Sequence, residues 1–377
     1  MSPSSAAHGL ITASPLADAI DLSQVRRALI IKLRHHGDVL LSSPVFSVLK
    51  ARAPEAEIDA LVYADTAEML SGHPAISRMH LVDRAWKGAG VLARAAAEWA
   101  LWRALKARRY DLIIHLTEHR RGMWLTRTLG AAARVAPRAR GDDSLWNESF
   151  SHFYAQPKTG NTRHTVEQNL DALRRIGITP HADERALTLV PGSDAEASID
   201  TLLREHGLAE RGFIQIHPAS RWMFKTWPAQ NTAQLIERLA ADGQRIVLTA
   251  GPAAAELALV AAIKAHCSAP IVDLAGRLTL KQLAALTRRA RAFVGVDSAP
   301  MHIASAMGTP AVALFGPSGE IEWGPWQVAH RIVASTRHTC RPCGNDGCGG
   351  SKVSECLTTL PVVRVLDEVR SLLNELR

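Results

Sequence analysis

Short β-branched runs alternate with helical patterns along almost the whole sequence, and this alternation limits the folds available to it. It is typical of parallel sheets covered by helices on both faces. The expected strands cover residues 28–33, 58–62, 79–82, 111–116 and 134–136, and then 213–217, 245–250, 271–274, 292–296, 311–315 and 331–334. Helical patterns separate them at residues 39–50, 91–106, 166–176, 229–241, 254–266, 280–288 and 300–307. Two sets of five or six strands predict an α/β chain of two doubly wound domains. A barrel would need eight evenly spaced units, and the polar stretch 144–165 interrupts the spacing.

The length of 377 residues fits two domains, and proline and glycine mark where the first of them ends. Pro180, Pro191 and Gly192 place the boundary within the segment 179–196. The expected parts are a flexible extension at 1–25, a first domain at 26–190, a second domain at 191–360 and a C-terminal helix at 361–377.

The sequence has no run of 18 apolar residues, so we expect no helix that spans a membrane. Its first 25 residues also lack the basic start and the long apolar stretch of a secretion signal. The expected location is therefore the cytoplasm.

Positive charge is concentrated in one segment of the chain. The formal net charge is +8, and residues 84–140 hold 13 Lys and Arg against three acidic residues. These cations are either solvated helix faces or a surface for a phosphorylated or membrane-bound substrate. A nucleic-acid partner is not expected, because no zinc-finger, RNP or basic-zipper pattern accompanies the charge.

The first group of candidate functional residues follows the first strand and opens a helix. A carboxylate in the position of Asp38 often only caps its helix. Here Gly37 permits a close approach of the backbone to a ligand, and Arg34 and His36 supply charge that keeps Asp38 ionised. An ionised carboxylate at this edge of a parallel sheet is a candidate general base.

The second group is the loop 217–228, which follows the first strand of the second half. Arg221 and Lys225 can both bind a phosphate. Trp227 is interpreted as a packing residue.

The third group, at 294–302, carries the strongest pattern. A strand ends in Asp297 and Ser298, and a helix begins with Pro300 in its first turn. The free backbone N–H groups of such a turn bind anions, although Asp297 or Ser298 could also simply cap the helix. His302 follows within the first turn.

Two common nucleotide fingerprints are missing from the sequence. No G-x-G-x-x-G follows the first strand, and no G-x-x-x-x-G-K-[ST] is present, which disfavours an NAD-dependent oxidoreductase and a P-loop protein. The absence of an Asp-x-Asp pair predicts that positive charge and helix N-termini, without a metal, hold a diphosphate. No cofactor is therefore expected.

Four cysteines, Cys340, Cys343, Cys348 and Cys356, cluster in a glycine-rich loop at 338–356. Their spacing fits neither a zinc ribbon nor a ferredoxin pattern. They are either plain thiols in a structured loop or a candidate structural metal site, and we predict no catalytic metal.

Three stretches of the sequence together resemble glycosyltransferase family 9, the bacterial lipopolysaccharide heptosyltransferases. They are IIKLRHHGDVLLSSPV, IHPASRWMFKTWP and GVDSAPMHIASAMGTPAVALFGPSG. The cysteine loop, HTCRPCGNDGCGGSKVSECL, is most similar to the heptosyltransferase III branch. The resemblance extends from about residue 27 to the C-terminus.

This resemblance implies the GT-B fold, in which two Rossmann-like domains face each other and the last helix crosses back to the first domain. It implies that the second domain binds ADP-L-glycero-D-manno-heptose and the first binds the lipid A–core oligosaccharide, beside the anionic inner leaflet of the membrane. The reaction would be an inverting, metal-independent transfer of heptose to the inner core. The alternatives are a heptosyltransferase I or II, a family member that moves another sugar, and a non-catalytic sugar-nucleotide-binding protein.

The resemblance also assigns roles to individual residues. Asp38 matches the family's catalytic aspartate, supported by Gly37, Arg34 and His36. The residues matched to donor binding are Ser220 and Lys225 at the diphosphate, Glu256 at the ribose, Leu278 at the adenine, and the motif residues Asp297, Ser298, Ala299 and His302. Other branches of the family have glycine at the position of Ala299.

Overall fold

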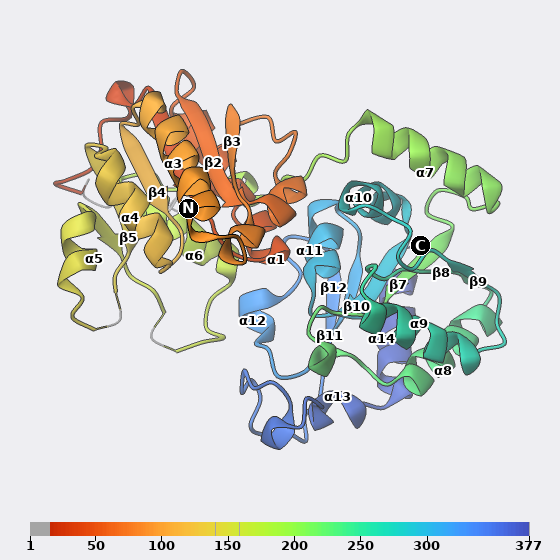
Figure 1. The fold of residues 1–377 in the computed structure, drawn as a ribbon. Helices are drawn as coiled ribbons and strands as arrows, with labels where there is room; N and C mark the ends of the chain where they lie inside the picture. Colours follow the sequence, from red (N-terminus) through yellow and green to blue (C-terminus); the bar gives the residue numbers. More distant parts are fainter. Residues whose placement is uncertain (1–15, 140, 158, 377) are drawn as a thin grey trace, which may run out of the picture.

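Two parallel six-stranded sheets form the frame of the molecule, one in each half of the chain (Figure 1). This computed structural model describes residues 16–139, 141–157 and 159–376. The first sheet contains β1 (Arg27–Ile31), β2 (Glu57–Tyr63), β3 (Arg78–Val82), β4 (Leu112–His115), β5 (Ala133–Pro137) and β6 (His152–Tyr154). The second contains β7 (Phe213–His217), β8 (Arg245–Leu248), β9 (Ile271–Asp273), β10 (Ala292–Val296), β11 (Ala311–Phe315) and β12 (His330–Ala334).

Both sheets are doubly wound. The strand orders are β3-β2-β1-β4-β5-β6 and β12-β11-β10-β7-β8-β9, so each half starts in the middle of its sheet and reverses direction there. In such sheets ligands bind beyond the carboxyl ends of the strands at the reversal point. That point lies between β1 and β4 in the first half and between β7 and β10 in the second. The predicted α/β architecture of two doubly wound sheets is confirmed.

Helices cover both faces of each sheet. They are α1 (His36–Leu40), α2 (Ser43–Arg52), α3 (Val91–Arg108), α4 (Arg120–Leu129), α5 (Ser144–Ser149), α6 (Thr165–Arg174), α7 (Ser193–Glu205), α8 (Ala229–Ala241), α9 (Ala254–Ala265), α10 (Leu280–Arg289), α11 (Ala299–Ala306), α12 (Glu320–Trp323), α13 (Glu355–Thr358) and α14 (Val362–Glu375). The single helix predicted over 39–50 is two helices. Leu41 and Ser42 form a turn that separates the two helices, and Pro44 lies in the first turn of α2. Proline suits a first turn because it has no backbone N–H to donate.

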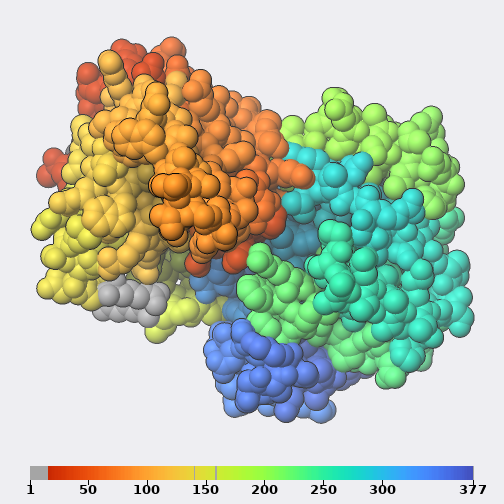
Figure 2. Space-filling view, in the orientation of Figure 1, coloured from red at the N-terminus to blue at the C-terminus, as the bar shows by residue number. Residues whose placement is uncertain are grey.

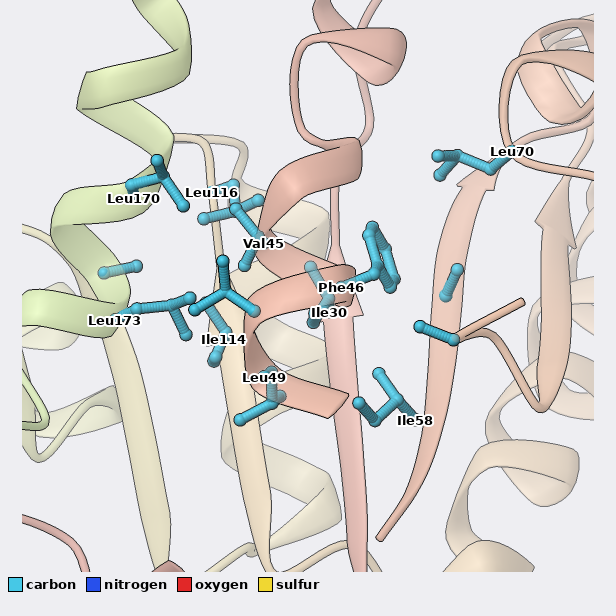
Figure 3. Packing of buried hydrophobic residues seen from close by; sticks show 14 of the residues in the cluster. Ile30, Val45, Phe46, Leu49, Ile58, Leu70, Ile114, Leu116, Leu170 and Leu173 are labelled. Atoms are coloured by element: carbon cyan, nitrogen blue, oxygen red, sulfur yellow. The ribbon is translucent and has the colours of Figure 1, made fainter. Parts of the chain in front are cut away.

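The largest core cluster lies between the first sheet and the helices α2 and α6 (Figure 3). Ile30 and Ile114 project from neighbouring strands onto Phe46 of α2 and Leu170 of α6, and all four are fully buried. Burial of each such side chain contributes about 1.5–3 kcal/mol. This packing holds the carboxyl ends of β1 and β4 in place.

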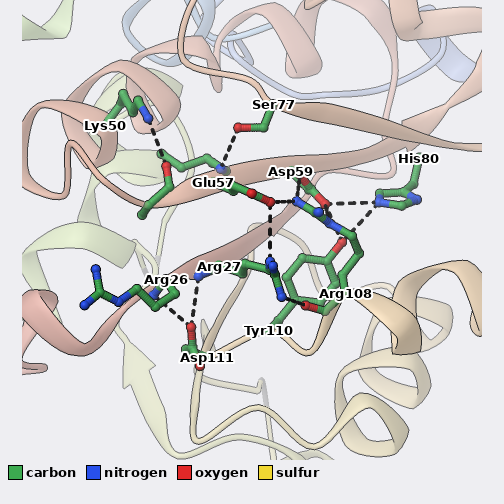
Figure 4. Close-up of polar contacts among 12 residues, drawn as sticks. Arg26, Arg27, Lys50, Glu57, Asp59, Ser77, His80, Arg108, Tyr110 and Asp111 are labelled. Atoms are coloured by element: carbon green, nitrogen blue, oxygen red, sulfur yellow. Dashed lines mark hydrogen bonds and ion pairs between the residues drawn. The ribbon is translucent and has the colours of Figure 1, made fainter.

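A buried ion cluster ties β2 to the C-terminal end of α3 (Figure 4). Asp59 is fully buried and accepts hydrogen bonds from Arg108 Nε at 2.7 Å and from the Tyr110 hydroxyl at 2.7 Å. Arg108 also pairs with Glu57. Asp59 lies toward the amino end of β2, away from the ligand-binding edge, so this part of the basic segment is structural.

The C-terminal helix packs on its own half of the molecule. Helix α14 contacts α8, β11 and β12, and its apolar stripe belongs to the core of the second sheet. The stripe consists of Val365, Leu366, Val369, Leu372 and Leu373. The prediction that this helix packs back toward the first half is wrong, because the second sheet already buries the whole stripe.

The described part of the predicted flexible extension is held against the first half. Asp18 forms an ion pair with Arg175, and the backbone N–H of Ile20 donates to the carbonyl of Ile176. Val25 is 5% exposed. The prediction of a flexible segment is therefore wrong for residues 16–25, and residues 1–15 lie outside the described residues.

Within the described ranges of the chain, no helix combines the length and the apolar character needed to cross a membrane.

Candidate active site

The two halves touch at the ligand-binding edges of their sheets. Helix α1, which follows β1, contacts α11, which follows β10 (Figure 1). A Cβ atom at Gly37 would lie 2.8 Å from Cδ2 of His302, so only glycine permits this approach without a shift. A second contact joins the halves beside it, where the Arg221 guanidinium donates to Nδ1 of His35 at 3.3 Å. Arg221, expected to bind phosphate, is thus engaged across the interface.

Asp38 lies in the first turn of α1, directly beyond the carboxyl end of β1. Its side chain is 14% exposed, and its Oδ1 is 3.5 Å from Nε of Arg34. His36 faces another partner, because its Nε2 is 2.7 Å from the carbonyl oxygen of Asp65. Arg34 is therefore the direct partner of the carboxylate, and His36 anchors the loop that carries it.

The predicted diphosphate residues of the second half come together at α11. Lys225 Nζ donates to Oδ2 of the buried Asp297 at 2.6 Å, which fixes the ammonium group beside the end of β10. Ser298 is the N-cap residue of α11, but its hydroxyl donates to the carbonyl of Val296 and makes no cap. Pro300 has no N–H and the N–H of Met301 donates to the carbonyl of Ser298, so the N–H of Ala299 is the first-turn donor that lies next to the lysine. This is an arrangement that favours an anion.

His302 lies between the turn that carries Asp38 and the Lys225–Asp297 pair. It is 3% exposed, and its Nδ1 has no hydrogen-bond partner among the described residues. Burial lowers the pKa of His302 to about 4, against the opposing influence of Asp297 and Asp38. The imidazole is therefore neutral at pH 7.

The remaining matched residues surround the same edge of the second sheet. Ser220 Oγ accepts from the backbone N–H of Trp222 at 3.3 Å, and Glu256 accepts from the backbone N–H of Gly251 at 2.8 Å. Leu278 is half-buried between the core clusters of the two halves. Ala299 is not among the residues with a positive φ, so its backbone conformation is one that alanine adopts without strain.

A cavity of about 400 Å³ opens beside Asp38 on the first half. Its walls come from the carboxyl ends of β1, β4 and β6, from α6, and from α12 of the second half. Lys32 forms part of the wall, is 5% exposed, and donates to the carbonyl of Leu116 at 3.3 Å and to Oδ1 of Asn169 at 2.9 Å. Burial lowers the pKa of Lys32 to about 8.

Sequence reasoning missed most of this cavity. One signal for it was available, since Thr117, Glu118 and His119 directly follow the predicted strand 111–116. Nothing in the sequence links Trp323 of α12 to the first half, and only the packing of the two halves brings it there.

The cysteine loop lies against the segment after β11, where Arg341 donates to the carbonyl of Gly316. Cys340 and Cys343 are exposed, Cys348 is half-buried, Cys356 is buried, and all four are free thiols. Over the described residues, no three His, Cys, Asp or Glu side chains are positioned to hold a metal ion. A structural metal in this loop stays a prediction.

Comparison with known proteins decides the family. Residues 98–353 match the model of glycosyltransferase family 9 (heptosyltransferase). The chain belongs to glycosyltransferase family 9. This family 9 enzyme is 36% identical over 296 residues to lipopolysaccharide heptosyltransferase 3 of Escherichia coli K12, covering 78% of this chain and 83% of that relative.

Solved structures show the same fold for this family 9 chain. The family 9 glycosyltransferase of Veillonella parvula matches with a TM-score of 0.80 at 22% identity, over 95% of this chain and all (100%) of that one. Escherichia coli heptosyltransferase WaaC, solved with ADP-2-deoxy-2-fluoro heptose, matches with a TM-score of 0.69 at 21% identity, over 93% and 99% of the two chains. The expected GT-B arrangement of two facing Rossmann-like domains is confirmed.

Proposed function

We propose that this family 9 enzyme transfers L-glycero-D-manno-heptose from ADP-heptose to the inner core of lipopolysaccharide, as a heptosyltransferase III-like enzyme. The observation that carries the proposal is the contact between α1 and α11. It puts the Asp38 carboxylate on one side of the interface and the Lys225–Asp297 pair on the other. The 36% identity to heptosyltransferase 3 supports the assignment to the heptosyltransferase III branch of the family.

In this proposal Asp38 is the general base. It accepts the proton of an acceptor hydroxyl, whose oxygen attacks the anomeric carbon of the donor from the face opposite ADP. The new glycosidic bond forms as the bond from the anomeric carbon to the diphosphate oxygen breaks, so the configuration inverts. Arg34 forms an ion pair with this carboxylate at 3.5 Å, which fixes its position in the first turn of α1.

The second half stabilises the departing diphosphate. Lys225 supplies a positive charge, and the backbone N–H of Ala299 at the start of α11 supplies a hydrogen bond. Ser220 and Ser298 lie in the two loops that frame this site and offer hydroxyl groups. We assign the ribose to Glu256 and the adenine to Leu278. The proposed reaction requires no metal.

We also propose that α3 rests on the anionic inner leaflet of the membrane, which places the enzyme on the cytoplasmic face. Val91 and Leu92 are 85% and 86% exposed, and Trp99 is 57% exposed. Cations flank these apolar residues on the same segment, namely Lys87, Arg94, Arg103 and Lys106. Figure 2 shows the first turns of α3, in orange, at the front of the first half. Exposed apolar side chains beside cations suit an anionic lipid surface.

Mass spectrometry of defined truncated core acceptors, incubated with ADP-heptose and this protein, tests the function. We expect a mass increase of one heptose on acceptors that carry the heptosyltransferase III site, and none on acceptors that lack it. If heptose were added only to the acceptors that heptosyltransferase I or II uses, the protein would be assigned to one of those two activities. No product with any acceptor would overturn heptosyl transfer.

A further inference from the structure

Two threonines in the wall of the cavity beside Asp38 carry buried hydroxyl groups with no hydrogen-bond partner in the described part of the chain. Thr117, which follows β4, is 7% exposed, and Thr165, at the start of α6, is 6% exposed. The Oγ1 atoms of both lack a hydrogen bond within the described ranges of the chain. Both residues line the same cavity. Burial of an unpaired hydroxyl costs free energy, so two such groups in one cavity indicate that a ligand completes their hydrogen bonds.

A third donor belongs to the same wall. The ammonium group of Lys32 has three N–H bonds, and the carbonyl of Leu116 and the side chain of Asn169 accept two of them. Asn169 is itself held by its own N–H donation to the carbonyl of Leu41 at 3.0 Å. Lys32 is therefore fixed in position with one N–H left for a ligand oxygen.

The charges around the cavity select the kind of ligand. Three carboxylates line it, Asp38, Glu118 and Glu322, against the two cations Lys32 and Arg34. A ligand with a carboxylate or phosphate of its own would meet a net negative wall.

The remaining wall suits a sugar ring. Burial, and to a smaller extent the positive charge of nearby Arg121, lowers the pKa of His119. This imidazole therefore adds no positive charge at pH 7. Trp323 and Tyr154 add aromatic surface, on which the C–H face of a sugar ring can pack.

We propose that this cavity is an acceptor subsite for an uncharged, hydroxyl-rich sugar ring. Thr117, Thr165 and Lys32 hydrogen-bond the hydroxyl groups of that ring and present one further hydroxyl to Asp38. This inference rests on the proposed function and adds the chemical class of the acceptor residue and the side chains that choose it.

Removal of the two hydroxyls, one at a time, gives a direct test. In Thr117→Val and Thr165→Val a methyl group replaces an unpaired hydroxyl, so the melting temperature should stay the same or rise. The KM for a truncated core acceptor should increase about tenfold in each, because one hydrogen bond to the ligand is lost. The KM for ADP-heptose should stay within twofold. Thr117→Ser and Thr165→Ser keep the hydroxyl and should restore the acceptor KM.

The outcomes separate this inference from the proposed function. An acceptor KM within twofold of wild type in both valine variants would overturn the subsite, while the heptosyl transfer of the wild type would stand. An increase that the serine variants share would also overturn it, because the effect would then follow from packing. A wild-type protein without turnover would instead contradict the proposed function.

The charge argument has its own probes. Methyl α-D-mannopyranoside is a neutral hydroxyl-rich ring, and the methyl glycoside of N-acetylneuraminic acid carries a carboxylate. We expect the neutral probe to compete with the acceptor in the wild type, and to compete about tenfold less well in Thr117→Val. Stronger competition by the carboxylate probe would overturn the assignment to a neutral sugar.

Discussion

At the residue scale, Asp38 combines a partly buried carboxylate with a position at the junction of the two halves. Only 14% of its side chain is exposed, Gly37 permits the close approach of α11, and Arg34 pairs with the carboxylate. The same turn therefore sets both the position of the proposed base and its distance from α11.

Replacement of Asp38 by asparagine should abolish transfer and leave the donor site in place. The amide keeps the shape of the side chain but cannot accept the acceptor proton. We expect kcat to fall by about 10²–10⁴-fold, the range of general-base catalysis. The dissociation constant for ADP, measured by calorimetry, should change less than about threefold. Asp346→Asn, in the exposed pair with Lys352, is the matched control. Near-wild-type turnover in Asp38→Asn would exclude the base role.

Lys225 belongs to the donor side, so its variants should act on ADP affinity. In Lys225→Met the ammonium group is lost and the buried Asp297 carboxylate keeps no cation at 2.6 Å. We expect the dissociation constant for ADP to rise about 10- to 100-fold, as for the loss of a charged hydrogen bond. The melting temperature should fall as well.

The double variant Lys225→Met with Asp297→Asn separates the two effects of that change. It removes the unpaired charge, so the melting temperature should recover while ADP binding stays weak. ADP affinity equal to wild type in the single variant would contradict the phosphate contact.

At the element scale, the positions of the candidate site residues could be predicted, because these residues directly follow strands that the sequence pattern predicts. Buried parallel strands such as β7 and β10 form short apolar runs, and their bounds match the prediction residue for residue. Strand β6 escaped because it is three residues long and lies in a polar stretch. The apolar stripe of α14 predicted a buried helix, but such a stripe does not identify the sheet that buries it.

Helix α3 begins beyond β3, at the same edge of the sheet that carries Asp38. A membrane contact there would bring a lipid-linked acceptor toward the cavity. Leu92→Glu places a negative charge among exposed apolar residues and should reduce binding to vesicles of anionic phosphatidylglycerol by tenfold or more in co-sedimentation. Turnover of a soluble, delipidated acceptor should stay unchanged. Leu257→Glu, at a 38% exposed leucine of the second half, is the control for vesicle binding. Equal loss in both variants would argue against α3 as the contact.

At the scale of the whole molecule, buried histidines predict how stability depends on pH. Burial lowers the pKa of His73, His217 and His302 to about 4 and that of His115 to about 3. In the unfolded chain these groups titrate near 6.5. Below that pH the unfolded state binds more protons than the folded state, so the free energy of unfolding falls as the pH drops from about 6.5 toward 4.

Each of these histidines can contribute up to about 3 kcal/mol to that loss. Urea titrations at pH 7.5 and 5 measure it. His217→Gln should flatten the dependence, since glutamine does not titrate, whereas the exposed His181→Gln should leave it as in wild type. An unfolding free energy that does not change between the two pH values would contradict the buried neutral state.

The arrangement of the two halves is the part that the sequence could not supply. Lys225, Asp297 and Ser298 were predictable as a donor site, because they follow strands of one sheet. The cavity beside Asp38 depends on Trp323, which lies 285 positions further along the chain and reaches the first half through packing between domains. Such a contact leaves no periodicity in the sequence.

The hydrogen atom that stands in for a side chain at Gly37 has a mechanical consequence. The two halves lie so close at this point that a Cβ atom at residue 37 would stand 2.8 Å from the ring of His302. The methyl group of an alanine there would force α1 and α11 apart. The separation between the Asp38 carboxylate and the Lys225 ammonium group, on which the proposed displacement depends, would then increase.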